Sequence, residues 1–76
     1  MTGPKRELWK DRVSGKLWAV ELARGRIVGC CGPLEATDVA GLNLADLPFE
    51  RDRGVLRTLS ARRGEFVRQN GGEEAA

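Results

Sequence analysis

Two short glycine turns constrain the fold of this chain more than any other feature. They are Ser14-Gly15 and Arg24-Gly25, and they stand ten residues apart between runs rich in Trp, Val, Leu and Ile. Such runs favour strands, and Gly supplies the positive φ that a two-residue hairpin turn requires. Gly32-Pro33 then ends the last run, because proline cannot continue a strand ladder. The pattern predicts an antiparallel meander of three strands, over Glu7–Val13, Lys16–Ala23 and Arg26–Cys31.

The turn lengths also predict the register of these strands. With two-residue turns Trp9 faces Val20 in the first hairpin, and Leu22 faces Ile27, Val20 faces Gly29 and Trp18 faces Cys31 in the second. The core face of the sheet then holds Trp9, Trp18, Val20, Leu22, Ile27 and Cys31. The opposite face, called the outer face below, holds Leu8, Lys10, Arg12, Leu17, Ala19, Glu21, Arg26, Val28 and Cys30. On this face we expect Glu21 to be solvated and paired with a neighbouring base.

The second half of the chain contains no further glycine-turn hairpin. Residues 34–49 predict an ordered apolar connector, in which Thr37-Asp38 opens a single helical turn. Residues 50–69 predict a helix with Asp52 as its N-cap and Gly64 as a point where it could split in two. Its apolar stripe consists of Val55, Leu56, Leu59, Phe66 and Val67.

These elements together predict an α+β fold. A three-stranded meander needs a cover for its apolar face, and the C-terminal helix is the best candidate, packed on the two tryptophans. We expect one small domain over residues 6–70, with disordered termini at 1–5 and 71–76. A chain of 76 residues buries only about 60% of the surface that its unfolded form exposes, so the core is small.

Several chemistries are poorly supported by the residues present. The chain has no His, the commonest general base and metal ligand. Its carboxylates are scattered, and the adjacent Cys30 and Cys31 point to opposite faces of a strand and cannot comfortably share one ion. We therefore expect no enzyme activity, metal, cofactor or small-molecule substrate. Two free thiols, no export segment and no apolar stretch of membrane length favour a cytoplasmic protein without a membrane span.

The basic residues carry the leading functional hypothesis. The formal net charge is only +2, but basic segments at 1–26 and 50–69 flank a middle segment, 27–49, that has acidic residues and no basic ones. Arginine is well suited to phosphate contacts, so the expectation is a small non-enzymatic interaction module that touches nucleic acid. The residues expected to make this contact are Lys10, Arg12, Arg26, Arg53, Arg57 and Arg68.

Three other interpretations remain open at this stage. The basic residues could form a solvated face with intrahelical ion pairs. The chain could be a homodimeric protein-binding module that uses the outer face or a strand edge, which would enlarge its small core. An enzyme or metal protein centred on Cys30 and Cys31 is the third. The tryptophans would stack on single-stranded bases only if the core face were open to water, and burial under the helix is the better hypothesis.

Overall fold

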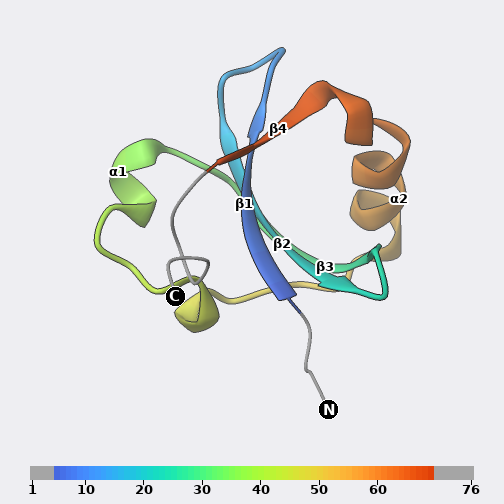
Figure 1. Ribbon diagram of the computed structural model, residues 1–76, viewed down its shortest axis with the longest axis horizontal. Helices are drawn as coiled ribbons and strands as arrows, with labels where there is room; N and C mark the ends of the chain where they lie inside the picture. The colour runs from blue at the N-terminus through green and yellow to red at the C-terminus, as the bar shows by residue number, and fades with distance from the viewer. Residues whose placement is uncertain (1–4, 70–76) are drawn as a thin grey trace.

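The computed structural model describes residues 5–69 and contains one antiparallel sheet of four strands in the order β3-β2-β1-β4 (Figure 1). The strands are β1 (Lys5–Asp11), β2 (Leu17–Ala23), β3 (Arg26–Leu34) and β4 (Phe66–Gln69). The α+β class and the three-stranded meander are confirmed, whereas the fourth strand is not predicted by the sequence pattern. The predicted end of the third strand at Gly32-Pro33 is wrong, since β3 continues to Leu34, which pairs with Leu17. Lys5, expected in the disordered lead, is the first residue of β1. The expectations for residues 1–4 and 70–76 lie outside the described residues.

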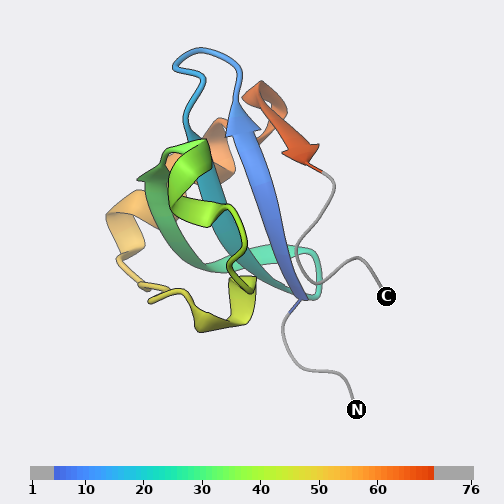
Figure 2. The same cartoon turned by 90° about the vertical axis from the view of Figure 1, so that its left-hand side faces the viewer.

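Both faces of the sheet are covered. One face packs on α2 (Arg53–Ala61). The other lies against the connector, which contains the short helices α1 (Ala36–Val39) and η1 (Leu44–Asp46) (Figures 1 and 2). The helical turn at Thr37-Asp38 is therefore confirmed as α1. Within residues 5–69 no helix has the length and apolar character needed to span a membrane.

The first hairpin differs from its predicted register by two residues, because Trp9 faces Trp18 instead of Val20. The connection is longer than a two-residue turn. The Asp11 N–H donates to the Lys16 carbonyl at 2.8 Å, and the Gly15 N–H donates to the Asp11 carbonyl, also at 2.8 Å. A shift by two residues leaves each side chain of the strand on its predicted face.

The second hairpin contains a bulge that reverses the faces of β3 beyond it. Leu22 faces Ile27 as predicted, but Glu21 faces Gly29, so Val28 is an extra residue in β3. Val20 consequently faces Cys30 instead of Gly29, and Ala19, not Trp18, faces Cys31. The predicted burial of Cys31 is therefore wrong. Cys30 is buried in the core at 3% exposure, and Cys31 is half-buried.

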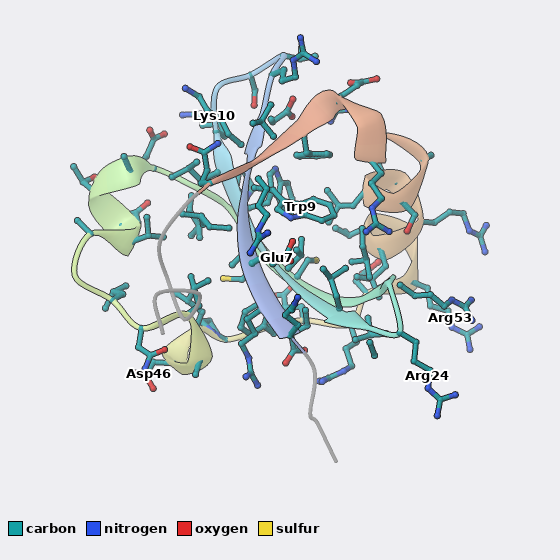
Figure 3. All side chains as sticks on the ribbon, in the orientation of Figure 1. Glu7, Trp9, Lys10, Arg24, Asp46 and Arg53 are labelled. Carbon is teal, nitrogen blue, oxygen red and sulfur yellow. The ribbon has the colours of Figure 1, made fainter. Side chains whose placement is uncertain are left out.

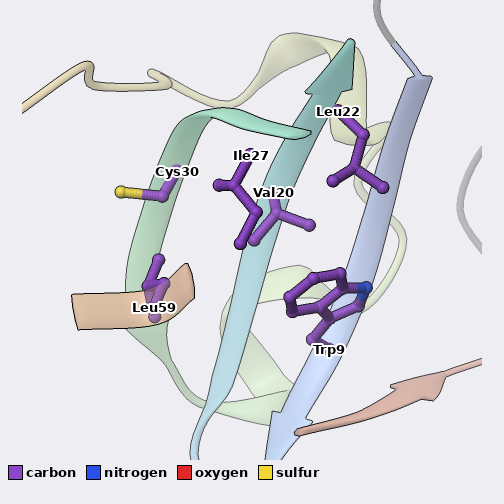
Figure 4. Packing of buried hydrophobic residues seen from close by; sticks show 6 residues of the cluster. All are labelled: Trp9, Val20, Leu22, Ile27, Cys30 and Leu59. Carbon is purple, nitrogen blue, oxygen red and sulfur yellow. The ribbon is translucent and has the colours of Figure 1, made fainter. Parts of the chain in front are cut away.

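The main core lies between the sheet and α2 (Figure 4). Its buried members are Trp9, Val20, Leu22, Ile27, Cys30 and Leu59, with Trp18, Val55, Leu56 and Phe66 packed around them. Burial of the tryptophans under the helix is confirmed for Trp9, which is 5% exposed, while Trp18 is half-buried. Leu59 is the fully buried residue of α2. It is the main point at which the helix enters this core.

The segment predicted as one long helix ends early and turns into a strand. Asp52 caps α2 as predicted, since its Oδ1 accepts the Val55 N–H at 3.1 Å. After Ala61 the chain passes through the short helix η2 (Arg63–Glu65) and becomes extended at Phe66. There it pairs with β1 as β4, with Phe66 opposite Asp11 and its ring centroid 5.8 Å from that of Trp9. Adjacent apolar residues such as Phe66 and Val67 are compatible with a strand as well as with a helix. The segment becomes a strand because it pairs with the edge of β1.

Candidate nucleic-acid interface

The arginines of the described chain fall into two groups. Five of them contact carboxylates, aromatic rings or a backbone carbonyl: Arg6, Arg51, Arg62, Arg63 and Arg68. The other five are exposed, and none forms an ion pair with a residue between 5 and 69: Arg12, Arg24, Arg26, Arg53 and Arg57. The side chains of the first group are held by contacts within the fold.

Among residues 5–69 the most buried charged residue is Glu21, which the connector covers. The residue is 3% exposed, so its predicted solvation is wrong, although its pairing with bases is confirmed. Its carboxylate lies 3.2 Å from Arg6 Nη2 and 3.1 Å from Arg51 Nη2. The Arg6 guanidinium also lies over the Phe49 ring, 5.7 Å from its centroid. These two arginines are therefore committed to holding the connector on the sheet.

A second buried carboxylate, Asp11, joins the end of β1 to the segment after α2. Its Oδ1 accepts the Val13 N–H at 2.9 Å and a hydrogen bond from Arg62 Nη2 at 2.8 Å. Arg62 also donates to Glu65 at 2.9 Å and lies over the Phe66 ring. These contacts, the Val13 N–H first and Arg62 second, lower the pKa of Asp11 below its ordinary value of 3.8.

The lowered pKa of Asp11 predicts a loss of stability in acid. Because the carboxylate binds a proton less readily in the folded state, its contribution is present above the ordinary pKa of 3.8 and disappears as the pH falls through the lower folded value. The urea midpoint of unfolding should therefore drop further between pH 7 and about pH 2 in the wild type than in Asp11→Asn. An Asp11→Asn variant with an unchanged pH profile would contradict this account.

Several basic residues lie at or reach the turn between β2 and β3. Arg24 and Gly25 form the predicted two-residue turn, with Arg26 directly opposite Ala23. Lys5 starts the neighbouring strand opposite Leu22, close to the same turn. Arg63 reaches this turn from η2, and its Nη1 donates to the Gly25 carbonyl at 2.7 Å. We call this group the hairpin cluster; its members are Lys5, Arg24, Arg26 and Arg63, all exposed.

A second basic group lies on α2. Arg53 and Arg57 are four residues apart in the helix and therefore share one face. We call them the helix pair. Figure 1 places α2 and the β2–β3 turn on the same side of the molecule, and Figure 2 shows that they are separated along the viewing direction of Figure 1. The two groups are thus spaced apart on one side instead of forming a single patch.

The expected site residues are all exposed, but the fold distributes them. Arg26 joins the hairpin cluster, and Arg53 with Arg57 forms the helix pair. Lys10 lies on the outer face opposite Val67, and Arg12 lies in the β1–β2 connection. Arg68 stands opposite Trp9 in β4, with its Nε 3.7 Å from Glu7 Oε2. The expected patch therefore divides into separate parts.

Sequence reasoning missed Lys5, Arg24 and Arg63 as members of a basic cluster. Arg24 had a signal of its own, because it precedes Gly25 in a turn where Asn is the usual residue. Its φ is +55°, in the left-handed region that costs a residue like arginine roughly 1–2 kcal/mol. Nothing in the local sequence marks Arg63 as a member, since its contact with Gly25 spans 38 positions of the chain. Lys5 was assigned to the disordered lead.

The acidic residues of the connector lie on the opposite side of the molecule from α2 and the β2–β3 turn. The middle segment supplies Glu35, Asp38 and Asp46, which belong to the connector around α1 and η1. Figure 3 shows Asp46 on this side and Arg24 and Arg53 on the other. The connector side is therefore acidic, whereas the side with the hairpin cluster and the helix pair carries exposed arginines together with Asp52, the N-cap of α2.

The cysteines do not form a reactive or metal-binding site in the described part of the chain. Burial, and second the Glu50 carboxylate, raise the pKa of the Cys30 thiol above 9.0, and the same two causes act on Cys31. Both thiols are therefore protonated at neutral pH and are weak nucleophiles. Between residues 5 and 69 no three His, Cys, Asp or Glu side chains lie close enough together to hold a metal ion.

Comparisons with protein-family models, with curated proteins and with solved structures found no match for this chain.

Proposed function

We propose that this protein is a non-enzymatic module that binds the phosphate backbone of nucleic acid through the hairpin cluster and the helix pair. The observation that carries the proposal is the hairpin cluster: four exposed basic residues lie at or reach one turn, and no carboxylate between residues 5 and 69 forms an ion pair with them. Exposed arginines in such a group repel one another and gain most from a phosphate-rich partner. The acidic connector on the far side would orient the basic side toward that partner.

The spacing of the two groups favours an extended polyanion over a small phosphate compound. A mononucleotide can contact only one of the two groups at a time. A nucleic-acid strand carries phosphates at regular intervals and can contact both. Such binding depends steeply on salt, because each phosphate contact releases condensed counterions. Each contact contributes about −0.9 to the slope of log K against log salt concentration on duplex DNA.

Two double variants test this proposal on a fluorescent oligonucleotide duplex. We expect Arg24→Gln/Arg26→Gln and Arg53→Gln/Arg57→Gln each to lower affinity about tenfold at low salt and to reduce the slope by about 2, because each removes two contacts. Fluorescence anisotropy at several salt concentrations measures both quantities. The matched control is Lys10→Gln/Arg12→Gln, which removes the same charge elsewhere on the sheet and should leave affinity within about twofold.

The control also decides between a local site and a diffuse electrostatic effect. Equal losses in all three double variants would show that only net charge matters. Wild-type binding that ignores salt, or no binding at low salt, would refute the proposal.

A second candidate, a homodimeric protein-binding module, keeps some support at the free edge of β4. Much of the outer face that suggested it is covered within one chain, since the connector buries Leu17 and Ala19. Val67 in β4 remains 45% exposed beside that edge, and Leu42 is 48% exposed. Sedimentation velocity tests this alternative. A discrete dimer that is insensitive to salt and is broken by Val67→Lys would support it, and a monomer at high micromolar concentration would refute it.

A further inference from the structure

The hairpin cluster places an arginine at a turn position that requires positive φ. Arg24 occupies the first central position of the β2–β3 turn at φ +55°, followed by Gly25 at φ +80°. Both central residues of such a turn need positive φ, and Asn-Gly satisfies this need with less strain than Arg-Gly. Nothing within residues 5–69 forms an ion pair with Arg24 to compensate. A strained arginine that forms no ion pair within the described residues points to a role in binding.

The turn that carries Arg24 is also fixed in place. The Gly25 carbonyl accepts a hydrogen bond from Arg63 Nη1 at 2.7 Å, and the Arg63 guanidinium lies over the Trp9 ring, 5.4 Å from its centroid. The turn is thereby tied to the buried Trp9 of the core, although its own residues are exposed. Because these contacts hold the backbone of the turn, the backbone that presents Arg24 loses little conformational entropy on binding.

The aromatic side chains argue against single-stranded nucleic acid as the partner. All four aromatic residues of the chain, Trp9, Trp18, Phe49 and Phe66, are buried or half-buried. Arg63 lies over Trp9, Arg6 over Phe49, and Arg62 over Phe66. Trp18 packs so closely on the backbone at Gly32 that a Cβ there would meet its ring at 2.8 Å. Proteins that bind single strands use exposed aromatic rings to stack on bases, and none is available here.

We infer that the partner is double-stranded DNA and that the β2–β3 turn inserts the Arg24 guanidinium into its minor groove, while Lys5 and Arg26 contact the flanking phosphates. The inference rests on the proposed function and names its substrate. An arginine is favoured in a narrow minor groove, where the negative potential is strongest. Runs of A·T base pairs have the narrowest groove, so the protein should prefer them although it reads no individual base.

The test compares three probes of equal length at one salt concentration: an A-tract duplex, a G·C-rich duplex and a single-stranded oligonucleotide. We expect the wild type to bind the A-tract duplex about tenfold more tightly than either of the others. Arg24→Lys keeps the charge and the strained position but loses the guanidinium, and it should lower the A-tract preference to about twofold or less. Arg24→Asn should lose the preference and raise the melting temperature by several degrees, because the strain is relieved. That rise shows that the weaker binding does not come from unfolding.

The possible failures can be told apart. Binding of all three probes with no A-tract preference would overturn the minor-groove inference and leave phosphate binding standing. An A-tract preference that survives in both Arg24 variants would also overturn it. Tighter binding of the single strand would show that the substrate class is wrong. Failure to bind any probe would refute the proposed function together with this inference.

Discussion

Replacing Glu21 with Gln is expected to lower the free energy of unfolding by about 3 kcal/mol, because it removes the only buried carboxylate near Arg6 and Arg51 among the described residues. Gln has the same shape and cannot neutralise the guanidiniums. Arg6 is the more sensitive partner, since its Nε is already buried without a hydrogen-bond partner between residues 5 and 69. The expected loss of stability lies near the lower end of the range for breaking buried ion pairs, because the Arg51 side chain is 64% exposed.

Urea denaturation of a matched set of variants measures this loss. Glu50→Gln is the control, since Glu50 is exposed and its side chain forms no ion pair within residues 5–69. Its change should stay within about 0.5 kcal/mol. Adding Arg6→Met to Glu21→Gln should recover part of the loss, because the charge left without a partner is then removed as well. A Glu21→Gln variant as stable as the Glu50 control would show that the buried pair contributes little.

Replacing Leu59 with Ala is expected to cost about 2–5 kcal/mol, the range for a buried leucine whose loss leaves a cavity. Leu59 is 2% exposed and is the only fully buried residue of α2. A domain of this size has a free energy of unfolding of roughly 4–11 kcal/mol, so the change removes a large share of it. Helix α2 should detach or the whole fold should melt at a much lower temperature.

Leu42→Ala is the matched control for this prediction, because it deletes the same atoms from a side chain that is 48% exposed. It should change the stability by less than about 0.5 kcal/mol. Thermal unfolding followed by tryptophan fluorescence suits both variants, since Trp9 and Trp18 lie in or against the same core as Leu59. Similar melting temperatures for the two variants would contradict the assignment of Leu59 as the anchor of α2.

Local signals in the sequence predicted the meander, the second turn, the cap at Asp52 and the burial of Trp9 under the helix. Each depends on neighbours in the chain: turn glycines, a capping carboxylate and alternating apolar residues. The features that were missed depend on distant contacts. The strand β4 forms because residues 66–69 meet the free edge of β1, and no periodicity within that segment distinguishes this from a helix.

In the candidate site, too, features set by neighbouring residues were predictable and features set by distant contacts were not. The pairing of Arg53 with Arg57 on one helical face follows from their spacing, and it was predictable. The exchange of Cys30 for Cys31 in the core follows from a single bulge at Val28, for which the sequence has no clear signal. The hairpin cluster needs Arg63 to reach Gly25 across the fold. Charge counts along the chain located the basic segments but could not assemble them.

Titration of the isotope-labelled protein with a short DNA duplex, followed by the backbone amide signals, would locate the DNA-binding surface residue by residue. We expect the largest shifts in the β2–β3 turn around Arg24 and at Arg53–Arg57 of α2, and we expect them to vanish at high salt. The part of the connector around α1 and η1 should shift least because it carries Glu35, Asp38 and Asp46. Shifts centred on the connector or on the β4 edge, or no shifts at low salt, would contradict the proposed binding surface.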